Sequence, residues 1–191
     1  MQTFPDIHLY HSPGTRSERV KKLLELLDFP HAITFVDQSA DAHKTDSYLK
    51  VNPFGKLPGM TVDGVSVVES AAQMLLIADL DPEHRYAPPT DHPMRKHYLQ
   101  WMVAMPASLE PLVMPMFNRA PSPNAHKCAK QAIAIQTSMF KGPYCAGGSL
   151  TAADVLVHWG LRFVAQMDLL EDAPLWLDYV ERLNAELDWV S

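Results

Sequence analysis

One stretch, Asn52 to Ser70, constrains the fold of this chain more than any other. Its sequence is NPFGKLPGMTVDGVSVVES. Two short apolar runs, residues 57–62 and 65–68, are joined by Asp63-Gly64, and an Asp-Gly pair between apolar runs is a strong signal for a β-hairpin. Helix-forming residues follow at 71–77. We therefore predict a strand, a turn, a second strand and a helix in immediate succession.

Pro58 and the Glu69-Ser70 pair indicate that this hairpin binds a ligand. A proline cannot donate to a sheet ladder, so Pro58 is expected at a strand start, with a cis Leu57–Pro58 bond that turns the preceding backbone outward. The N–H and C=O of Leu57 would then be available to an extended peptide. Glu69 and Ser70 open a helix whose free N–H groups favour an anion. These features together predict a site for a small anionic peptide with a free amino terminus.

The combination of residues 52–58 with Glu69-Ser70 resembles the glutathione transferase superfamily. The thioredoxin-like N-terminal domain of that superfamily carries the motif N-P-x-G-K-[LV]-P and then E-S, and this chain has every fixed position. The resemblance implies that glutathione is a co-substrate, with its cysteinyl backbone at Leu57 and Pro58 and its γ-glutamyl group at Glu69 and Ser70. Lys56 is either a solvated charge or, from its spacing to Pro58, a contact to the carboxylate end or main chain of the peptide.

The preceding residues fit the order expected for a thioredoxin-like α/β domain. Residues 7–10 and 32–36 are predicted strands, and a helix from Thr15 to about residue 27 connects them, which favours a parallel strand pair. A further helix is predicted over 42–50. The first helix has apolar residues at the helical period, with charged residues on its other face: Arg16, Glu18, Arg19, Lys21, Lys22 and Glu25.

The second half of the chain is predicted to be an all-helical bundle. Prolines mark a linker over 81–90, so the domains are expected at 1–80 and 91–191. Helices are predicted over 92–117, interrupted by its prolines, over 124–140, from Thr151 onward, and over 173–187. Thr151 and Asp154 have the spacing of a capping box. A similar G-x-x-x-T-x-A-D segment nucleates the core helix of the C-terminal domain in glutathione transferases.

Composition excludes several classes of function. The chain has 191 residues, 47% of them hydrophobic, and a formal charge of −6, so we expect no nucleic-acid surface, which would require basic residues. No apolar stretch approaches the roughly 20 residues of a membrane span, and the N-terminus lacks the pattern of a signal peptide. Cys128 and Cys145 are isolated and the histidines form no ligand motif. We therefore expect a soluble cytoplasmic protein without a metal.

The loop of residues 12–17 is the candidate for catalysis. Ser12 and Thr15 are the leading candidates to stabilise a thiolate and Ser17 is a weaker one, although each could simply be a turn or cap residue. The resemblance to the serine-type theta and delta transferases falls on Ser12. Tyr10 is a weaker candidate again, because it lies within the predicted strand. The cysteine-type transferases carry their cysteine where this chain has Arg16, and we expect Arg16 to pair with the helical domain.

The resemblance implies a homodimeric glutathione transferase of the detoxification type, which activates the glutathione thiol for attack on a small hydrophobic electrophile. Apolar residues between 98 and 117 suit such an acceptor but are equally expected in a core or dimer interface. Two alternatives use the same site or fold: a glutathione-dependent isomerase or peroxidase, and a non-enzymatic adaptor. A thiol-disulfide oxidoreductase is disfavoured because neither cysteine lies near the first helix.

Overall fold

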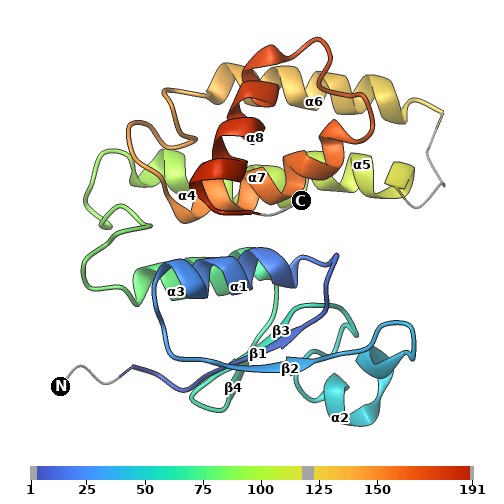
Figure 1. Cartoon of the computed structure of the whole chain (residues 1–191), viewed down its shortest axis with the longest axis vertical. Helices are drawn as coiled ribbons and strands as arrows, with labels where there is room; N and C mark the ends of the chain where they lie inside the picture. Colours follow the sequence, from blue (N-terminus) through green and yellow to red (C-terminus); the bar gives the residue numbers. More distant parts are fainter. Residues whose placement is uncertain (1–3, 118–122, 190–191) are drawn as a thin grey trace. The chain divides into compact units, whose positions relative to one another are not determined.

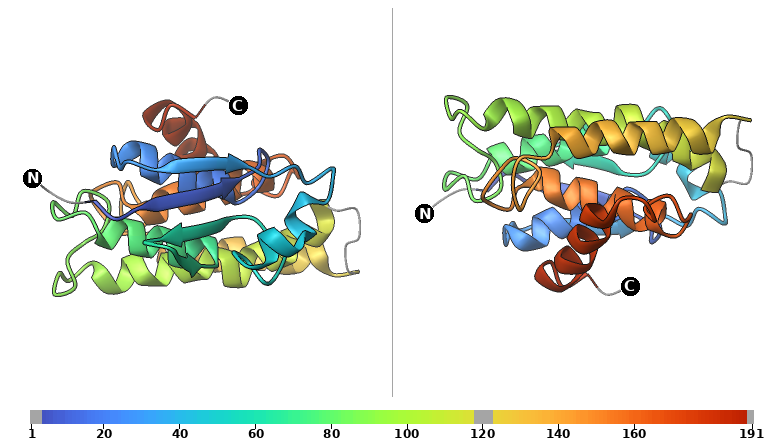
Figure 2. Two further views of the ribbon diagram at one scale, coloured as in Figure 1. Left: turned by 90° about the horizontal axis from the view of Figure 1, so that it is seen from below. Right: turned by 90° about the horizontal axis from the view of Figure 1, so that it is seen from above.

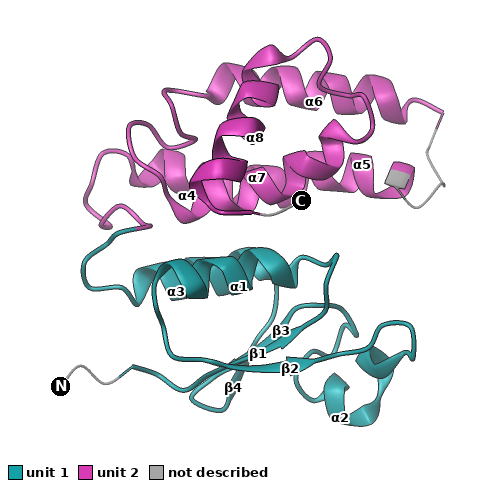
Figure 3. Ribbon diagram, in the orientation of Figure 1, with its two compact units in different colours: residues 1–85 teal, residues 86–191 magenta. Residues whose placement is uncertain are grey.

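The structure, a computed structural model, describes residues 4–117 and 123–189. Two compact units divide the chain, residues 1–85 and 86–191 (Figure 3). Each unit is described by itself below. No helix in the described ranges is both long enough and apolar enough to cross a membrane.

Unit 1 is built on a four-stranded mixed sheet in the order β2-β1-β3-β4 (Figure 2). The central strand β1 (Ile7–His11) is parallel to β2 (Ala32–Phe35) and antiparallel to β3 (Gly59–Val62). Strand β4 (Val65–Val67) pairs with β3 across the predicted Asp63-Gly64 turn. Leu9 lies at the centre of this register, opposite Ile33 on one side and Met60 on the other, and it is fully buried.

Helices cover the sheet as expected for a thioredoxin-like domain. Helix α1 (Ser17–Leu26) and helix α3 (Ser70–Asp79) lie side by side over one face (Figure 1). Their apolar stripes form the core with the inward side chains of β1 and β3, namely Ile7, Leu9, Val20, Leu23, Leu24, Met60, Met74 and Ile77. This arrangement confirms the α/β fold class predicted for the first half of the chain.

Three predictions for unit 1 were wrong in detail. The first strand of the hairpin begins at Gly59, because residues 52–58 form a loop held by side chains. The helix predicted over 42–50 is a 3₁₀ turn, η1 (Ala42–Lys44), followed by one short helix, α2 (Asp46–Leu49), which is capped by Thr45. Helix α1 begins at Ser17, two residues later than predicted, because Thr15 belongs to the preceding loop.

Unit 2 is a bundle of helices joined by loops, one of which contains an isolated β-bridge between Tyr144 and Gly147. The long helix predicted from residue 92 is α4 (Arg95–Ala104), a π-helical segment η2 (Met105–Leu109) and α5 (Glu110–Phe117). The π-helical segment contains Pro106, which cannot donate a backbone hydrogen bond, so the predicted interruption is confirmed there. Helix α5, in contrast, continues through Pro111 and Pro115, which were also predicted to interrupt it. The remaining helices are α6 (Ala125–Met139), α7 (Ala152–Ala165) and α8 (Pro174–Glu186). Helix α7 packs against α4, α5 and α8 and is buried along most of its length.

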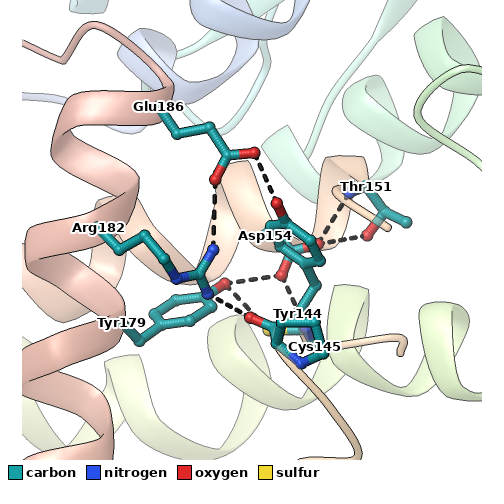
Figure 4. Close-up of polar contacts among 8 residues, drawn as sticks. Tyr144, Cys145, Thr151, Asp154, Tyr179, Arg182 and Glu186 are labelled. Atoms are coloured by element: carbon teal, nitrogen blue, oxygen red, sulfur yellow. Dashed lines mark hydrogen bonds and ion pairs between the residues drawn. The ribbon is translucent and has the colours of Figure 1, made fainter. Parts of the chain in front are cut away.

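The predicted capping box of α7 is present and extends beyond the helix. The buried carboxylate of Asp154 accepts hydrogen bonds from the Thr151 N–H and hydroxyl, both at 2.8 Å (Figure 4). Its other oxygen accepts from the Cys145 N–H at 2.7 Å and from the Tyr179 hydroxyl at 2.8 Å. Burial raises the pKa of Asp154, and the hydrogen bonds oppose that shift. One carboxylate therefore joins the loop before α7, the α7 N-terminus and α8.

The buried His158 of α7 predicts that acid destabilises the protein. Its Nε2 lies 2.9 Å from Asn184 Oδ1, and burial lowers its pKa to about 4. Between pH 6.5 and 4 the unfolded chain binds this proton and the folded chain does not, so stability falls as pH falls. From pH 7 to pH 5 the group is expected to remove about 2 kcal/mol from the free energy of unfolding.

Urea unfolding of the wild type and His158→Gln at both pH values measures this contribution. The His158→Gln protein should lose about 2 kcal/mol less than the wild type over the same interval. The exposed His126 of α6 provides the matched control, and His126→Gln should keep the wild-type pH dependence. An equal pH dependence of all three proteins would show that His158 is not responsible.

Candidate functional site

A small hollow on unit 1 brings together five residues predicted to bind glutathione. Its volume is about 60 Å³, so it has room for a terminal group of a ligand but not for a whole tripeptide. The residues that line it come from the loop before β3, the α3 N-terminus and the start of α1: Arg16, Asn52, Phe54, Lys56, Leu57, Pro58, Glu69 and Ser70. Residues far apart in the sequence are therefore neighbours at this hollow.

Side chains hold the loop before β3 in place. The Tyr48 hydroxyl donates to the Lys56 carbonyl at 2.6 Å. The amide of the buried Asn52 donates to the Lys56 and Pro58 carbonyls at 2.7 and 3.2 Å. Burial raises the pKa of Tyr48 to about 12, so this hydroxyl stays protonated and keeps donating. The loop on both sides of Leu57 is thereby fixed.

Leu57 itself lies between these anchors with its backbone available. The Leu57–Pro58 peptide bond is cis, as predicted. The carbonyls of Lys56 and Pro58 are occupied by Tyr48 and Asn52. Within the described ranges, neither the N–H nor the C=O of Leu57 has a hydrogen-bond partner. An extended peptide beside Leu57 could pair with both groups, which is the geometry of strand addition.

The N-terminus of α3 forms the other side of the hollow. Glu69 occupies the N-cap position with φ 68° and ψ 111°, and its side chain makes no capping bond. A positive φ is unfavourable for a glutamate and is retained where the surroundings impose it, often at ligand sites. The exposed carboxylate of Glu69 suits a ligand ammonium group, whereas the uncapped α3 N–H groups suit a carboxylate.

The predicted catalytic loop between β1 and α1 contains a tight hydroxyl network. Ser17 Oγ lies 2.7 Å from both His11 Nδ1 and Thr15 Oγ1, and it accepts from the Ser12 N–H at 3.1 Å. Thr15 Oγ1 donates to the Ser12 carbonyl at 2.7 Å. The Ser12 hydroxyl, in contrast, has no partner in the part of the chain that the structure describes. Ser12 and Thr15 do not line the hollow, although Arg16, the next residue along the loop, does.

Comparison with known proteins finds similarity to glutathione S-transferases. Residues 5–79 match the family described as "Glutathione S-transferase, N-terminal domain". Over 191 aligned residues the chain is 28% identical to Glutathione S-transferase 3 of Schizosaccharomyces pombe, covering 88% of this chain and 78% of that relative. The first half of the chain is therefore similar to the N-terminal domain of glutathione S-transferases, and most of the chain is similar to a glutathione S-transferase.

Solved structures of glutathione S-transferases have the same fold. The chain is similar to a ternary complex of BphK, a bacterial glutathione S-transferase, with a TM-score of 0.81, 26% identity, and coverage of 93% of this chain and 92% of that one. A glutathione transferase homologue from Sulfitobacter, solved with bound glutathione, gives a TM-score of 0.75 at 19% identity, with coverage of 94% and 93%. The predicted combination of a thioredoxin-like domain with a helical domain is confirmed.

Sequence reasoning missed three residues at or beside this candidate site. Arg16 lines the hollow, although we had expected it only to pair with the helical domain. His11 joins the hydroxyl network. Burial lowers the pKa of His11, and the nearby positive charge of Lys21 lowers it further. Arg19 was predicted on the polar face of its helix, but it is fully buried and donates to Ser70 Oγ. The charge pattern could not reveal Arg19, because Ser70 is 51 residues away in the sequence.

Unit 2 contributes a larger cavity but none of the predicted site residues. This cavity, of about 400 Å³, lies beside α6 and the start of α8, over apolar side chains with the exposed Lys130–Asp172 ion pair at its rim. Both cysteines also lie in unit 2, where burial raises the pKa of Cys145 and Cys128 is half-buried in α6. Neither thiol belongs to the β1–α1 loop, which agrees with the low ranking of the oxidoreductase alternative.

Proposed function

We propose that this protein is a glutathione transferase that activates the glutathione thiol for attack on a small hydrophobic electrophile. One observation carries the proposal. The available backbone of Leu57, the acid of Glu69 and the hydroxyl of Ser70 lie around one hollow in a domain of the matching family. An extended peptide with an amino-acid head group has complementary chemistry for all three.

The proposed binding mode follows from charge. The γ-glutamyl ammonium group pairs with the Glu69 carboxylate, and the neighbouring carboxylate lies at Ser70 and the α3 N-terminus. The cysteinyl main chain pairs with the N–H and C=O of Leu57. Lys56, exposed at the same hollow, contacts the glycyl carboxylate or the main chain. Glutathione acts here as a co-substrate, and the mechanism requires no metal.

Ser12 is proposed to stabilise the thiolate. A free thiol has a pKa of about 8.5, and lowering it by about 2 units requires about 2.7 kcal/mol of preferential thiolate stabilisation. A hydrogen bond to a charged acceptor contributes about 1.5–3 kcal/mol, and a helix N-terminus adds about 0.3–1. The uncommitted Ser12 hydroxyl can supply the hydrogen bond, whereas Thr15 already donates to the Ser12 carbonyl. The N-terminus of α1, whose first residue Ser17 accepts from the Ser12 N–H, can supply the smaller contribution. The thiolate sulfur then bonds to the electrophilic carbon and displaces its leaving group.

Calorimetric titration with glutathione tests the binding step. The wild type is expected to bind with a heat signal, and Glu69→Gln should weaken binding about 10-fold or more, because the charge-assisted contact to the ligand ammonium group is lost. Glu83→Gln, at an exposed carboxylate of the same unit, is the control and should bind like the wild type. Turnover of a chloronitrobenzene acceptor by the wild type then tests transfer.

Two other functions give different outcomes in the same assays. An isomerase or peroxidase using the same site would bind glutathione but turn over a different acceptor. An adaptor would neither bind a glutathione column nor shift its melting temperature at millimolar glutathione. The retained peptide-binding groups favour an enzyme over an adaptor. We also propose a cytoplasmic homodimer from the family resemblance, with sedimentation equilibrium as the test of the dimer.

A further inference from the structure

Arg19 is a fully buried cation directly behind the proposed ligand site. It lies on α1 with none of its surface exposed. Its Nε–H and one terminal N–H donate to Ser70 Oγ at 3.2 and 2.7 Å. Burying a guanidinium is costly, so a chain that retains one in its interior uses it for a specific contact. Ser70 receives two of the hydrogen bonds that Arg19 makes.

This contact determines what the Ser70 hydroxyl can do. A serine hydroxyl has two acceptor lone pairs and one proton. Arg19 can only donate, so it occupies the acceptor side of Ser70 Oγ and the hydroxyl proton must point elsewhere. Within the described ranges that proton has no acceptor, and Ser70 lines the hollow. The hydroxyl is therefore held ready to donate to a ligand.

We infer that Arg19 is a positioning residue that makes this subsite selective for a carboxylate over a neutral amide. The inference rests on the proposed function. Ser70 donates to the ligand carboxylate while Arg19 orients and polarises the hydroxyl from behind, and the α3 N-terminus adds positive potential on the same side. A neutral amide at the same place loses the charge-assisted hydrogen bond and the attraction to the guanidinium. Arg19 itself need not contact the ligand.

The test compares two ligands: glutathione, and an analogue whose γ-glutamyl α-carboxylate is converted to an amide. The wild type is expected to prefer glutathione by about 20-fold or more in dissociation constant. Arg19→Met and Ser70→Ala should each reduce that preference to a few-fold, and Arg19→Met in the Ser70→Ala background should change it little further. The loss should appear mainly as a rise in the KM for glutathione, because the lost contact is in binding.

Lys21→Met is the matched control, since it removes a cation from the same helix at a half-exposed position paired with Glu25. It should keep the wild-type preference. A purely structural role for Arg19 would lower the melting temperature and weaken both ligands equally, leaving their ratio intact. If Arg19→Met does not fold, Arg19→Lys and Ser70→Ala decide the question, because unaltered preference in both would overturn the inference. Failure of the wild type to bind glutathione at all would instead refute the proposed function.

Discussion

Replacing Ser12 with alanine is expected to lower kcat/KM at pH 6.5 by about 50-fold. If Ser12 lowers the pKa of bound glutathione from about 8.5 to about 6.5, half of the thiol is ionised at pH 6.5 in the wild type and about 1% in the variant. The deficit should shrink to less than twofold at pH 9, where both proteins hold mostly thiolate. A pH profile of kcat/KM, together with the ultraviolet absorbance of the bound thiolate, measures both effects.

Variants of the neighbouring hydroxyl residues test whether Ser12 is the residue that stabilises the thiolate. Thr15 Oγ1 and Ser17 Oγ are engaged with each other, with His11 and with the Ser12 carbonyl. Thr15→Ala should therefore disturb the loop without raising the thiol pKa by 2 units. A full pKa shift in Thr15→Ala but not in Ser12→Ala would move the assignment to Thr15. Wild-type turnover in both would refute thiolate stabilisation by either hydroxyl. Ser66→Ala, at an exposed serine on the hairpin, is the control.

The hairpin and its flanking motif could be predicted because their signals are local. Asp63-Gly64 specifies its turn within a few residues, and Pro58 cannot lie inside a ladder. The capping box of α7 and the interruption at Pro106 are equally local. Each follows from the conformational preferences of neighbouring residues, so no knowledge of the rest of the fold is needed.

Long-range polar contacts could not be predicted in this way. The periodicity of α1 assigns every charged residue to the solvent face, but Arg19 is turned inward to a hydroxyl from another helix. The loop before β3 is fixed by Asn52 and Tyr48 through carbonyls that any residue would supply. Such contacts depend on tertiary packing, which overrides helical amphipathicity. The sequence therefore predicts least well the buried side chains that hold the site residues in place.

Asp154 likewise makes long-range polar contacts in addition to capping α7. A capping box accounts for the bonds from Thr151, whereas Cys145 and Tyr179 come from the preceding loop and from α8. Around the same point the Tyr144 hydroxyl donates to Glu186, which also pairs with Arg182 (Figure 4). Several elements of unit 2 thus converge where the loop enters α7.

Asp154→Ala is expected to lower the free energy of unfolding by about 4 kcal/mol. Loss of the cap costs about 1 kcal/mol. The buried N–H of Cys145 is left without an acceptor and the buried Tyr179 hydroxyl keeps only the weak acceptor Cys145 Sγ at 3.2 Å, and these losses cost about 1–3 kcal/mol each. For a chain of this size the melting temperature should fall by roughly 10 °C. Asp154→Asn keeps the shape but has one acceptor oxygen, so its loss should be intermediate. Asp178→Ala, at an exposed carboxylate of α8, should change stability by less than about 0.5 kcal/mol. A loss below about 1 kcal/mol in Asp154→Ala would mean that water replaces the carboxylate and that α7 does not depend on it.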